Sequence, residues 1–300
     1  MAGLLKEVWL AAIMENYYRQ ASHLKRSQDM SGFVNNNAIN LAEAGSVPKV
    51  LKNNTIYPVP MAARNDNAIR LQLDYYDTEG TVISNAEAVQ YAYNKLSSVT
   101  WNHSMALLER FSDIASYNWS PTQDATNTPC FATSGADRGD GRKSFSFADI
   151  AKMEQQFTQK KFPKMGRILV LSPQHKADLL VQDAQLFKSF ADLKSGQVLN
   201  LYGFEIYEYG GYATYNGSTG VKRTVADDLS FDAAAGTDSP SSLFYCEGEV
   251  MHAIGDMDMF FTPKSTSVSL RSDAIGVQAR FIASSIRNKA AGVVYSGIVD

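Results

Sequence analysis

The central segment of the chain, residues 162–212, constrains the fold more than any other part of the sequence. Its apolar run Ile168–Leu171 is short and rich in β-branched residues, which favours a strand buried on both faces. Ser172 and Pro173 follow directly, and a hydroxyl side chain beside a proline is a preferred opening of a helix. Later in the segment, Phe204–Tyr209 alternates apolar and polar residues as a half-buried strand does. The order strand, helix, strand predicts an α/β unit in the middle of the chain.

The overall composition is that of a globular protein with one large or two modest cores. The 300 residues are 45% hydrophobic and 20% charged, and the net charge of −3 gives no global attraction to nucleic acid. Two cysteines, Cys130 and Cys246, provide no disulfide framework. No apolar run approaches the ~20 residues that a membrane helix needs, so no membrane partner is expected.

The first 30 residues show an amphipathic helical pattern, with Trp9, Ile13 and Tyr17 on one face. A segment this short forms no core of its own. These three side chains are therefore expected to contact another part of the subunit or a neighbouring subunit. Residues 31–56 are rich in asparagine and have no regular period, which indicates an extended arm with turns.

Residues 57–83 have the pattern of a long β-hairpin. Residues 57–62 form the expected outgoing strand, a polar turn follows at 64–67, and residues 68–73 return with strict alternation. Two prolines in the outgoing strand argue against a central place in a sheet. Because an isolated two-stranded hairpin is marginal in water, this one is expected to lie on a partner.

Residues 85–118 carry one long helical pattern, which a capping box at Ser84 opens. At the rise of an α-helix this segment would be ~50 Å long. The weaker helix formers Ser97–Thr100 in its centre predict a bend or a soft point. A polar loop, a second helix at 147–162 and the central α/β unit follow, and residues 243–300 contain several strands.

No group of residues has the spacing of a catalytic or metal site. The four histidines are scattered, without the close spacing of zinc ligands. The chain has no phosphate-binding glycine loop and no nucleophile motif. We therefore expect no enzyme activity, no cofactor and no metal.

The order of these elements resembles the Hong Kong 97-like fold of major capsid proteins from tailed double-stranded DNA bacteriophages. Short motifs add to the resemblance: LSP after the central strand, GFEI at the return strand, and AINLAEAG, YPVPMA, AYNKLSSV and RSDAIGVQARF elsewhere. The resemblance implies an α+β fold with five parts. These are an N-arm at 1–56, an E-loop hairpin at 57–83, a P-domain with a long spine helix at 84–121, an A-domain at 122–245 and return strands of the P-domain at 246–300.

The resemblance implies a structural role in the virion capsid. Subunits of this family assemble in the cytoplasm of the bacterial host, through pentamers and hexamers, into the icosahedral head around phage DNA. The implied partners are other copies of the chain, a portal protein, decoration or auxiliary capsid proteins, and packaged double-stranded DNA held by weak non-specific contacts. Many members begin with a long internal scaffold segment. The arm here begins soon after Met1, so a separate scaffolding protein is expected.

The resemblance also implies which residues matter for assembly, because the hairpin of one subunit would lie across the spine helix of its neighbour. The contact residues of the hairpin are Met61, Arg64, Asn65, Asp66, Asn67, Ile69 and Arg70. The hinge candidates, which let one subunit fit both pentamers and hexamers, are Ser97, Ser98, Thr100, Asp77 and Gly80. Two alternatives stay open: an encapsulin-type compartment with the same fold and, from a different class, a soluble α/β ligand-binding or hydrolase-like protein.

Overall fold

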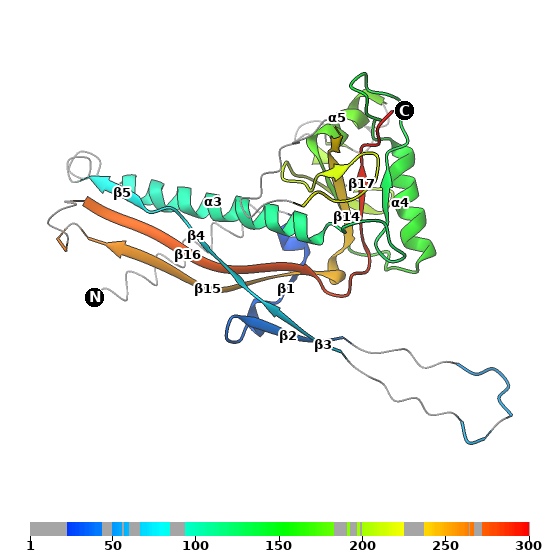
Figure 1. Cartoon of the computed structure of the whole chain (residues 1–300), viewed down its shortest axis with the longest axis horizontal. Coiled ribbons are helices and arrows are strands. Elements are labelled where there is room, and N and C mark those ends of the chain that lie inside the picture. The colour runs from blue at the N-terminus through cyan, green and yellow to red at the C-terminus, as the bar shows by residue number, and fades with distance from the viewer. Residues whose placement is uncertain are drawn as a thin grey trace.

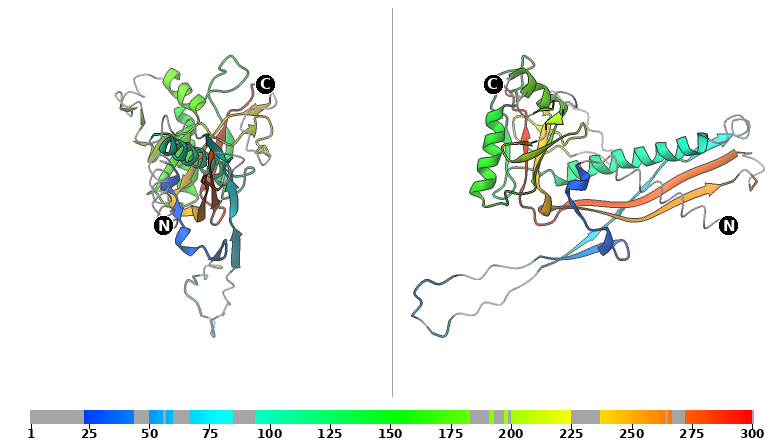
Figure 2. Two further views of the ribbon diagram at one scale, coloured as in Figure 1. Left: turned by 90° about the vertical axis from the view of Figure 1, so that its left-hand side faces the viewer. Right: turned by 180° about the vertical axis from the view of Figure 1, so that it is seen from behind.

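The computed structural model shows three parts: an elongated sheet with a long helix along it, a compact α/β unit at one end, and a hairpin that projects away from both (Figure 1). Two further views show the same arrangement (Figure 2). The described residues are 23–43, 50–55, 57–59, 67–84, 94–182, 191–192, 197–198, 200–224, 237–263, 265–266 and 272–299. None of the described helices is long and apolar enough to cross a membrane.

The elongated sheet is built on two long antiparallel strands, β15 (Val250–Thr262) and β16 (Ser272–Ser285). Its order is β1-β15-β16-β4, and β5 also pairs with β16. The shorter strands are β1 (Gln28–Asp29), β4 (Asp74–Asp77) and β5 (Thr81–Ser84). Alternate residues of β16 are buried because they face α3 (Asn94–Trp119), which lies along the sheet. The predicted long helix is therefore confirmed from residue 94 onward, and residues 85–93 lie outside the described part.

The α/β unit holds a six-stranded sheet in the order β10-β11-β7-β14-β17-β6. Its strands are β6 (Cys130–Ala132), β7 (Arg167–Leu171), β10 (Asn200–Leu201), β11 (Phe204–Glu208), β14 (Ser241–Cys246) and β17 (Ala291–Tyr295). Two helices, α4 (Phe147–Gln159) and α5 (Pro173–Gln182), share one core cluster with one face of this sheet. The C-terminal half of α3 packs with the other face. The buried strand, the helix and the return strand predicted for the central segment are all confirmed.

Several short elements complete the fold. Two further strand pairs join β8 (Ala191–Asp192) to β9 (Gln197–Val198) and β12 (Tyr215–Asn216) to β13 (Asp238–Ser239). Short 3-10 helices span Leu24–Arg26, Ser31–Phe33 and Glu247–Glu249.

The hairpin differs from the predicted one in its outgoing strand. The returning strand, β3 (Asn67–Gln72), pairs with β2 (Ala38–Glu43), which the sequence analysis placed in an extended arm. The expected outgoing strand at 57–62 is wrong at its described residues 57–59, which form no strand, and residues 60–62 lie outside the described part. The prolines in that segment have no backbone N–H to donate to a neighbouring strand. Strand β2 instead buries the side chain of Ile39 fully, in the cluster that includes Leu73. The hairpin therefore begins about twenty residues earlier than predicted.

The ends of the predicted hairpin and of the return strands also need correction. Residues 74–83, expected at the hairpin base, and Ser84, expected to cap the long helix, supply β4 and β5 to the elongated sheet. Strand β17, expected to return to the sheet under the long helix, instead joins the α/β unit between β14 and β6. Its residues Val293 and Val294 are both fully buried, which requires cover on both faces. In the six-stranded sheet, the cluster with α3 covers Val293 and the cluster with α4 and α5 covers Val294.

Candidate assembly interface

A pocket of about 890 Å³ lies between α3 and the strip formed by β4 and β5. The strip supplies the residues from Asp74 to Glu79 and Thr81, and α3 supplies Val99, Asn102, His103, Ala106, Leu107 and Arg110. These α3 residues recur every three or four positions, so one face of the helix forms one wall. The pocket thus runs along the side of the elongated sheet that is formed by β4 and β5, opposite to β15 and β1.

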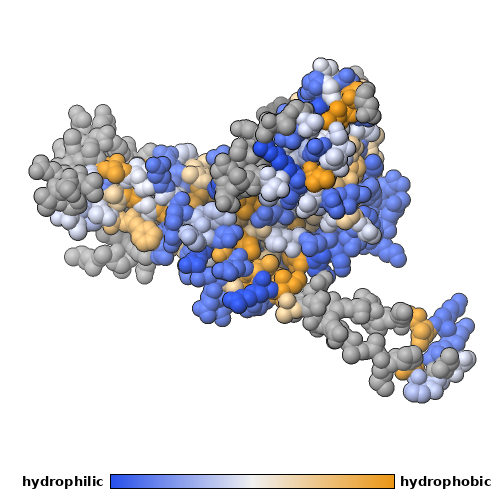
Figure 3. Space-filling model, viewed as in Figure 1, coloured by the Kyte–Doolittle hydropathy of each residue, from blue (hydrophilic) through white to orange (hydrophobic). Residues whose placement is uncertain are grey.

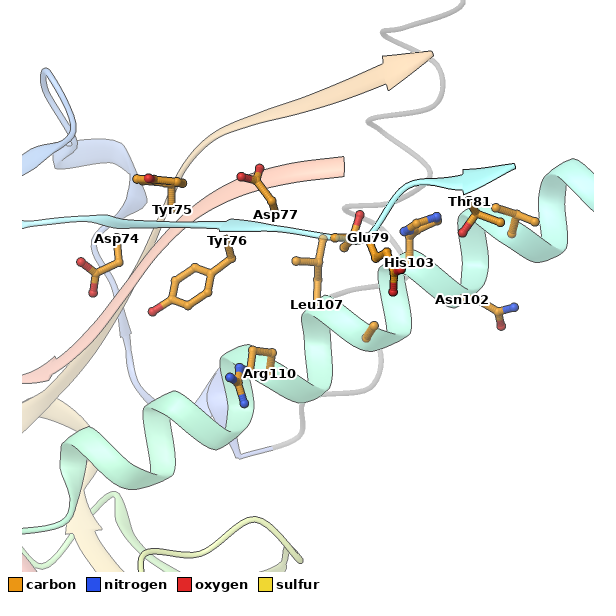
Figure 4. A pocket seen from close by; sticks show the side chains of 13 residues that line it. Asp74, Tyr75, Tyr76, Asp77, Glu79, Thr81, Asn102, His103, Leu107 and Arg110 are labelled. Atoms are coloured by element: carbon orange, nitrogen blue, oxygen red, sulfur yellow. The ribbon is translucent and has the colours of Figure 1, made fainter. Parts of the chain in front are cut away.

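The wall of the pocket combines acidic, basic and aromatic side chains. Figure 4 shows Asp74 and Tyr76 pointing toward α3, while Tyr75 and Asp77 point to the opposite side of the strand. Burial raises the pKa of Tyr76 to about 12, and the negative charge of Asp74 adds to the shift while Arg110 opposes it. The phenol of Tyr76 is therefore neutral at neutral pH and can donate a hydrogen bond.

His103 brings an unsatisfied polar atom to this pocket. Its side chain is only 6% exposed, and its Nε2 has no hydrogen-bond partner among the described residues. Burial lowers the pKa of His103, so the ring is neutral at neutral pH. A buried polar atom without a partner is costly, and a ligand or a second chain that bonds to it would recover that cost.

The hairpin projects away from the rest of the chain (Figure 1) and exposes apolar side chains near its end (Figure 3). Val50 is 97% exposed and Tyr57 is 75% exposed, and Leu51 and Val59 are also exposed. The connecting segment 44–66 carries three basic residues and one acidic residue in the sequence. An apolar, basic projection of this kind is suited to a partner surface outside its own subunit.

The predicted contact residues are only partly within the described chain. Asn67, Ile69 and Arg70 lie on β3, opposite Glu43, Leu41 and Asn40 of β2. The side chain of Ile69 is partly buried, and that of Arg70 is exposed. Met61, Arg64, Asn65, Asp66 and the predicted N-arm contacts Trp9, Ile13 and Tyr17 lie outside the described residues. The role of all these residues in assembly stays a prediction.

The predicted hinges fall in continuous or paired backbone. Ser97, Ser98 and Thr100 belong to the uninterrupted helix α3. Asp77 pairs with Gln278 of β16, and Gly80 lies in the link between β4 and β5. That link is anchored at Thr78, whose backbone N–H donates to Val277 O at 2.8 Å and whose Oγ1 accepts from Val277 N at 2.9 Å. Movement at either place stays a prediction.

The structure places His175 between two serines, a grouping that the spacing of these residues in the sequence did not indicate. His175 Nδ1 lies 2.7 Å from Ser242 Oγ, and its Nε2 lies 3.0 Å from Ser296 Oγ. The ring is fully buried and stacks on Phe145, and burial lowers its pKa to about 3, with a smaller contribution from Arg138. Because no substrate reaches a fully buried ring, the pair joins α5 to β14 and the chain after β17. Within the described part of the chain, no three metal-ligating side chains gather.

The pocket residues were missed at the level of sequence, although one signal was present. His103, Leu107 and Arg110 follow one another at helical spacing, which places them on one face of α3. Their acidic counterpart Asp74 lies far away in the sequence, so only the pairing of β4 with β16 brings it to α3.

The chain is similar to solved phage capsid structures over nearly its whole length. The capsid structure of cyanophage P-SCSP1u gives a TM-score of 0.67 at 13% identity and covers 92% of this chain and 87% of that chain. The capsid of Ralstonia phage GP4 gives a TM-score of 0.65 at 10% identity and covers 92% of this chain and 88% of that chain. The capsid of a native GTA particle gives a TM-score of 0.60 at 10% identity, with 92% and 90% covered. No protein-family model and no curated protein matches the sequence.

Each similarity covers nearly all of this chain and nearly all of the capsid chain. It therefore decides the architecture. The chain has the Hong Kong 97-like capsid fold. The α+β class expected from the sequence is confirmed with it. Helix α3 lies within the range expected for the spine helix, and the hairpin that projects from β2 and β3 is called the E-loop. A hydrolase-like α/β fold is not favoured, because capsid chains of this fold cover 92% of the chain.

Proposed function

We propose that this protein is a major capsid protein that assembles into the icosahedral head of a tailed bacteriophage. The observation that carries the proposal is the match to phage capsid chains over both the elongated sheet and the α/β unit. The role is structural, because a subunit of a shell acts through its surfaces and not through a reacting group. Its place would be the capsid of the virion.

We infer that the E-loop of one subunit lies against the spine helix of the next. The E-loop exposes apolar residues near its end and carries excess basic charge. The pocket between α3 and the strip of β4 and β5, which we call the spine pocket, offers the acidic Asp74 beside the aromatic Tyr76. Such a contact joins two different surfaces, head to tail, and closes into rings of five or six when the rotation fits. The sum of many interfaces of ordinary size, ~1,600 Å² each, would then stabilise the shell.

The other partners follow from the same proposal. A separate scaffolding protein would direct assembly, a portal protein would occupy one vertex, and decoration or auxiliary proteins would bind outside. The net charge of −3 supports only weak non-specific contact with the packaged double-stranded DNA.

Electron microscopy with mass determination tests the proposal. The purified protein should form rings, sheets or closed shells as its concentration rises, either alone or when expressed with the neighbouring genes. A species of 33.0 kDa under all these conditions would refute the shell function. Particles that contain an enclosed cargo protein and no portal would instead favour an encapsulin-type compartment.

A further inference from the structure

His23, the first residue that the structure describes, packs against α3. His23 Nε2 lies 3.3 Å from Ser116 Oγ of α3, and its ring centroid is 4.5 Å from that of Tyr209. Its carbonyl oxygen accepts a hydrogen bond of 3.1 Å from Tyr245 Oη. The next residue, Leu24, is buried in the main core. His23, the residue that directly follows the first 22, is therefore held beside α3.

The segment after His23 shows that this is the side of α3 that faces β15. Ser27 Oγ lies 2.7 Å from His252 Nδ1 on β15, and β1 then pairs with β15 in parallel. Trp119, near the end of α3, donates from Nε1 to Met251 O of β15 at 3.1 Å on the same side. The spine pocket lies on the opposite side of the helix, toward β4.

An apolar surface continues along this side, away from the α/β unit. We define the apolar flank as Trp101 and Met105 of α3 with Met257, Met259 and Phe261 of β15. Trp101 and Met105 lie on the same face of α3 as Ser112 and Ser116 by helical spacing. The three β15 residues pair with Ala279, Val277 and Ile275, which are buried beneath α3, so they share that side of the sheet.

The apolar flank is partly exposed among the described residues. Trp101 is 47% exposed and Phe261 is 48% exposed, while Met105, Met257 and Met259 are partly buried. Among the described strands, β15 has a neighbour on its outer edge only at Met251 and His252, where β1 pairs. Large apolar side chains along an open strand edge indicate a missing contact.

The N-terminal sequence fits this surface in pattern and length. Leu5, Trp9, Ile13 and Tyr17 recur every four residues, whereas Glu7 and Glu15 fall outside that face. A helix over residues 1–22 would extend ~33 Å back from His23, and the distance along α3 from Ser116 to Trp101 is ~22 Å. A helix alongside α3 therefore places Ile13 opposite Met105 without any linker.

We propose that residues 1–22 dock as an amphipathic helix on the apolar flank of their own subunit. The C-terminal end of this helix adjoins His23, which is fixed beside α3, so the helix stays close to the flank. Docking within one chain therefore has a high effective concentration. Exposed apolar side chains of both partners would leave water together. This inference concerns the single subunit and holds whether or not shells form.

Cross-linking tests the position of the helix. In Ile13→Cys with Met105→Cys, a short bis-maleimide should join the two thiols several-fold faster than in the matched control Glu15→Cys with Met105→Cys, whose first thiol faces away. The native Cys130 and Cys246 add little background, because both are buried and burial raises their pKa values to about 12 and about 11. Equal rates in the two variants would refute a docked helix.

The same chemistry separates docking on the own subunit from docking on a neighbour. The linked product of the double variant should run at the mass of one chain, 33.0 kDa. A mixture of the two single variants, Ile13→Cys and Met105→Cys, should yield almost no linked dimer at the same total concentration. Abundant linked dimer from that mixture would overturn the assignment to the own chain.

Limited proteolysis provides a measurement that does not depend on the Met105 substitution. Phe261→Asp puts a charge on the apolar flank at a half-exposed position and should accelerate tryptic cleavage after Arg19 several-fold. Tyr75→Asp is the matched control, because Tyr75 is 66% exposed and points away from α3. Identical cleavage in both variants and the unmodified protein would refute the proposal.

Discussion

The α/β unit and the E-loop use apolar residues in opposite ways. All six residues of β14 are buried, between a cluster that contains α4 and α5 and a cluster that contains α3. In the E-loop, Val50 is 97% exposed and Tyr57 is 75% exposed. The α/β unit is therefore stabilised within the subunit, whereas the apolar side chains near the end of the E-loop have no such cover among the described residues of their own chain, which agrees with the proposed contact to a neighbouring subunit.

Replacement of residues 45–65 by a short Gly-Ser turn should have the largest effect on assembly and almost none on the fold. The variant keeps the β2–β3 ladder and loses the projecting part. We expect an unchanged melting temperature and complete loss of closed particles, measured by calorimetry and negative-stain microscopy. Normal particles from this variant would show that the E-loop is not an assembly arm.

Leu107→Asp should unfold the subunit, because it puts an unpaired charge on a side chain that is 4% exposed at the spine helix. The expected loss in the free energy of unfolding is about 4 kcal/mol or more. Urea unfolding followed by circular dichroism measures it. The adjacent Ala106→Asp is the matched control, since Ala106 is exposed and should cost much less. A soluble Leu107→Asp protein with a native spectrum would contradict the burial of this helix face.

Acid should lower the free energy of unfolding through the buried His23, which lies in the core and not in the E-loop. Burial lowers the pKa of His23 to about 4 from an ordinary value of 6.5, so the unfolded state takes up the proton first. The stability that His23 contributes as a neutral ring is fully present above pH 6.5 and is lost as the pH falls toward 4. The free energy of unfolding should drop by up to about 3 kcal/mol over this range.

Urea unfolding between pH 7 and pH 4 measures this loss, with His23→Gln as the comparison. The variant keeps a polar group near Ser116 but has no titrating ring, so its stability should fall less steeply over that range. If both proteins lost the same stability, His23 would not be the group responsible.

Arg26→Ala should have the smallest effect. Arg26 lies 2.6 Å from Glu205 and 3.4 Å from Glu247, but all three side chains are about one third exposed. Solvent and salt screen such pairs, so we expect a loss of about 0.5–1 kcal/mol that shrinks in high salt. Thermal unfolding at two salt concentrations tests this. A loss comparable to that of Leu107→Asp would mean that this pair is a main link between the N-terminal segment and the α/β unit.

Local sequence signals predicted individual elements well. The apolar run at β7, the Ser172-Pro173 opening of α5, the alternation of β11 and the period of α3 each gave the correct element. These signals depend on neighbours within a few residues, where periodicity and capping act. The candidate interface could not be predicted in the same way, because its pocket joins Asp74 and Arg110 from elements that meet only in the folded chain.

The sequence by itself determined the buried central strand, the long spine helix and the capsid-like order of elements. Only the tertiary structure decided that β3 pairs with Ala38–Glu43 and that β17 joins the six-stranded sheet. A strand pairs with whichever open edge and apolar face the rest of the fold presents, and that choice depends on residues far away in the sequence. Helix period and capping are local, whereas strand partnership is a property of the whole molecule.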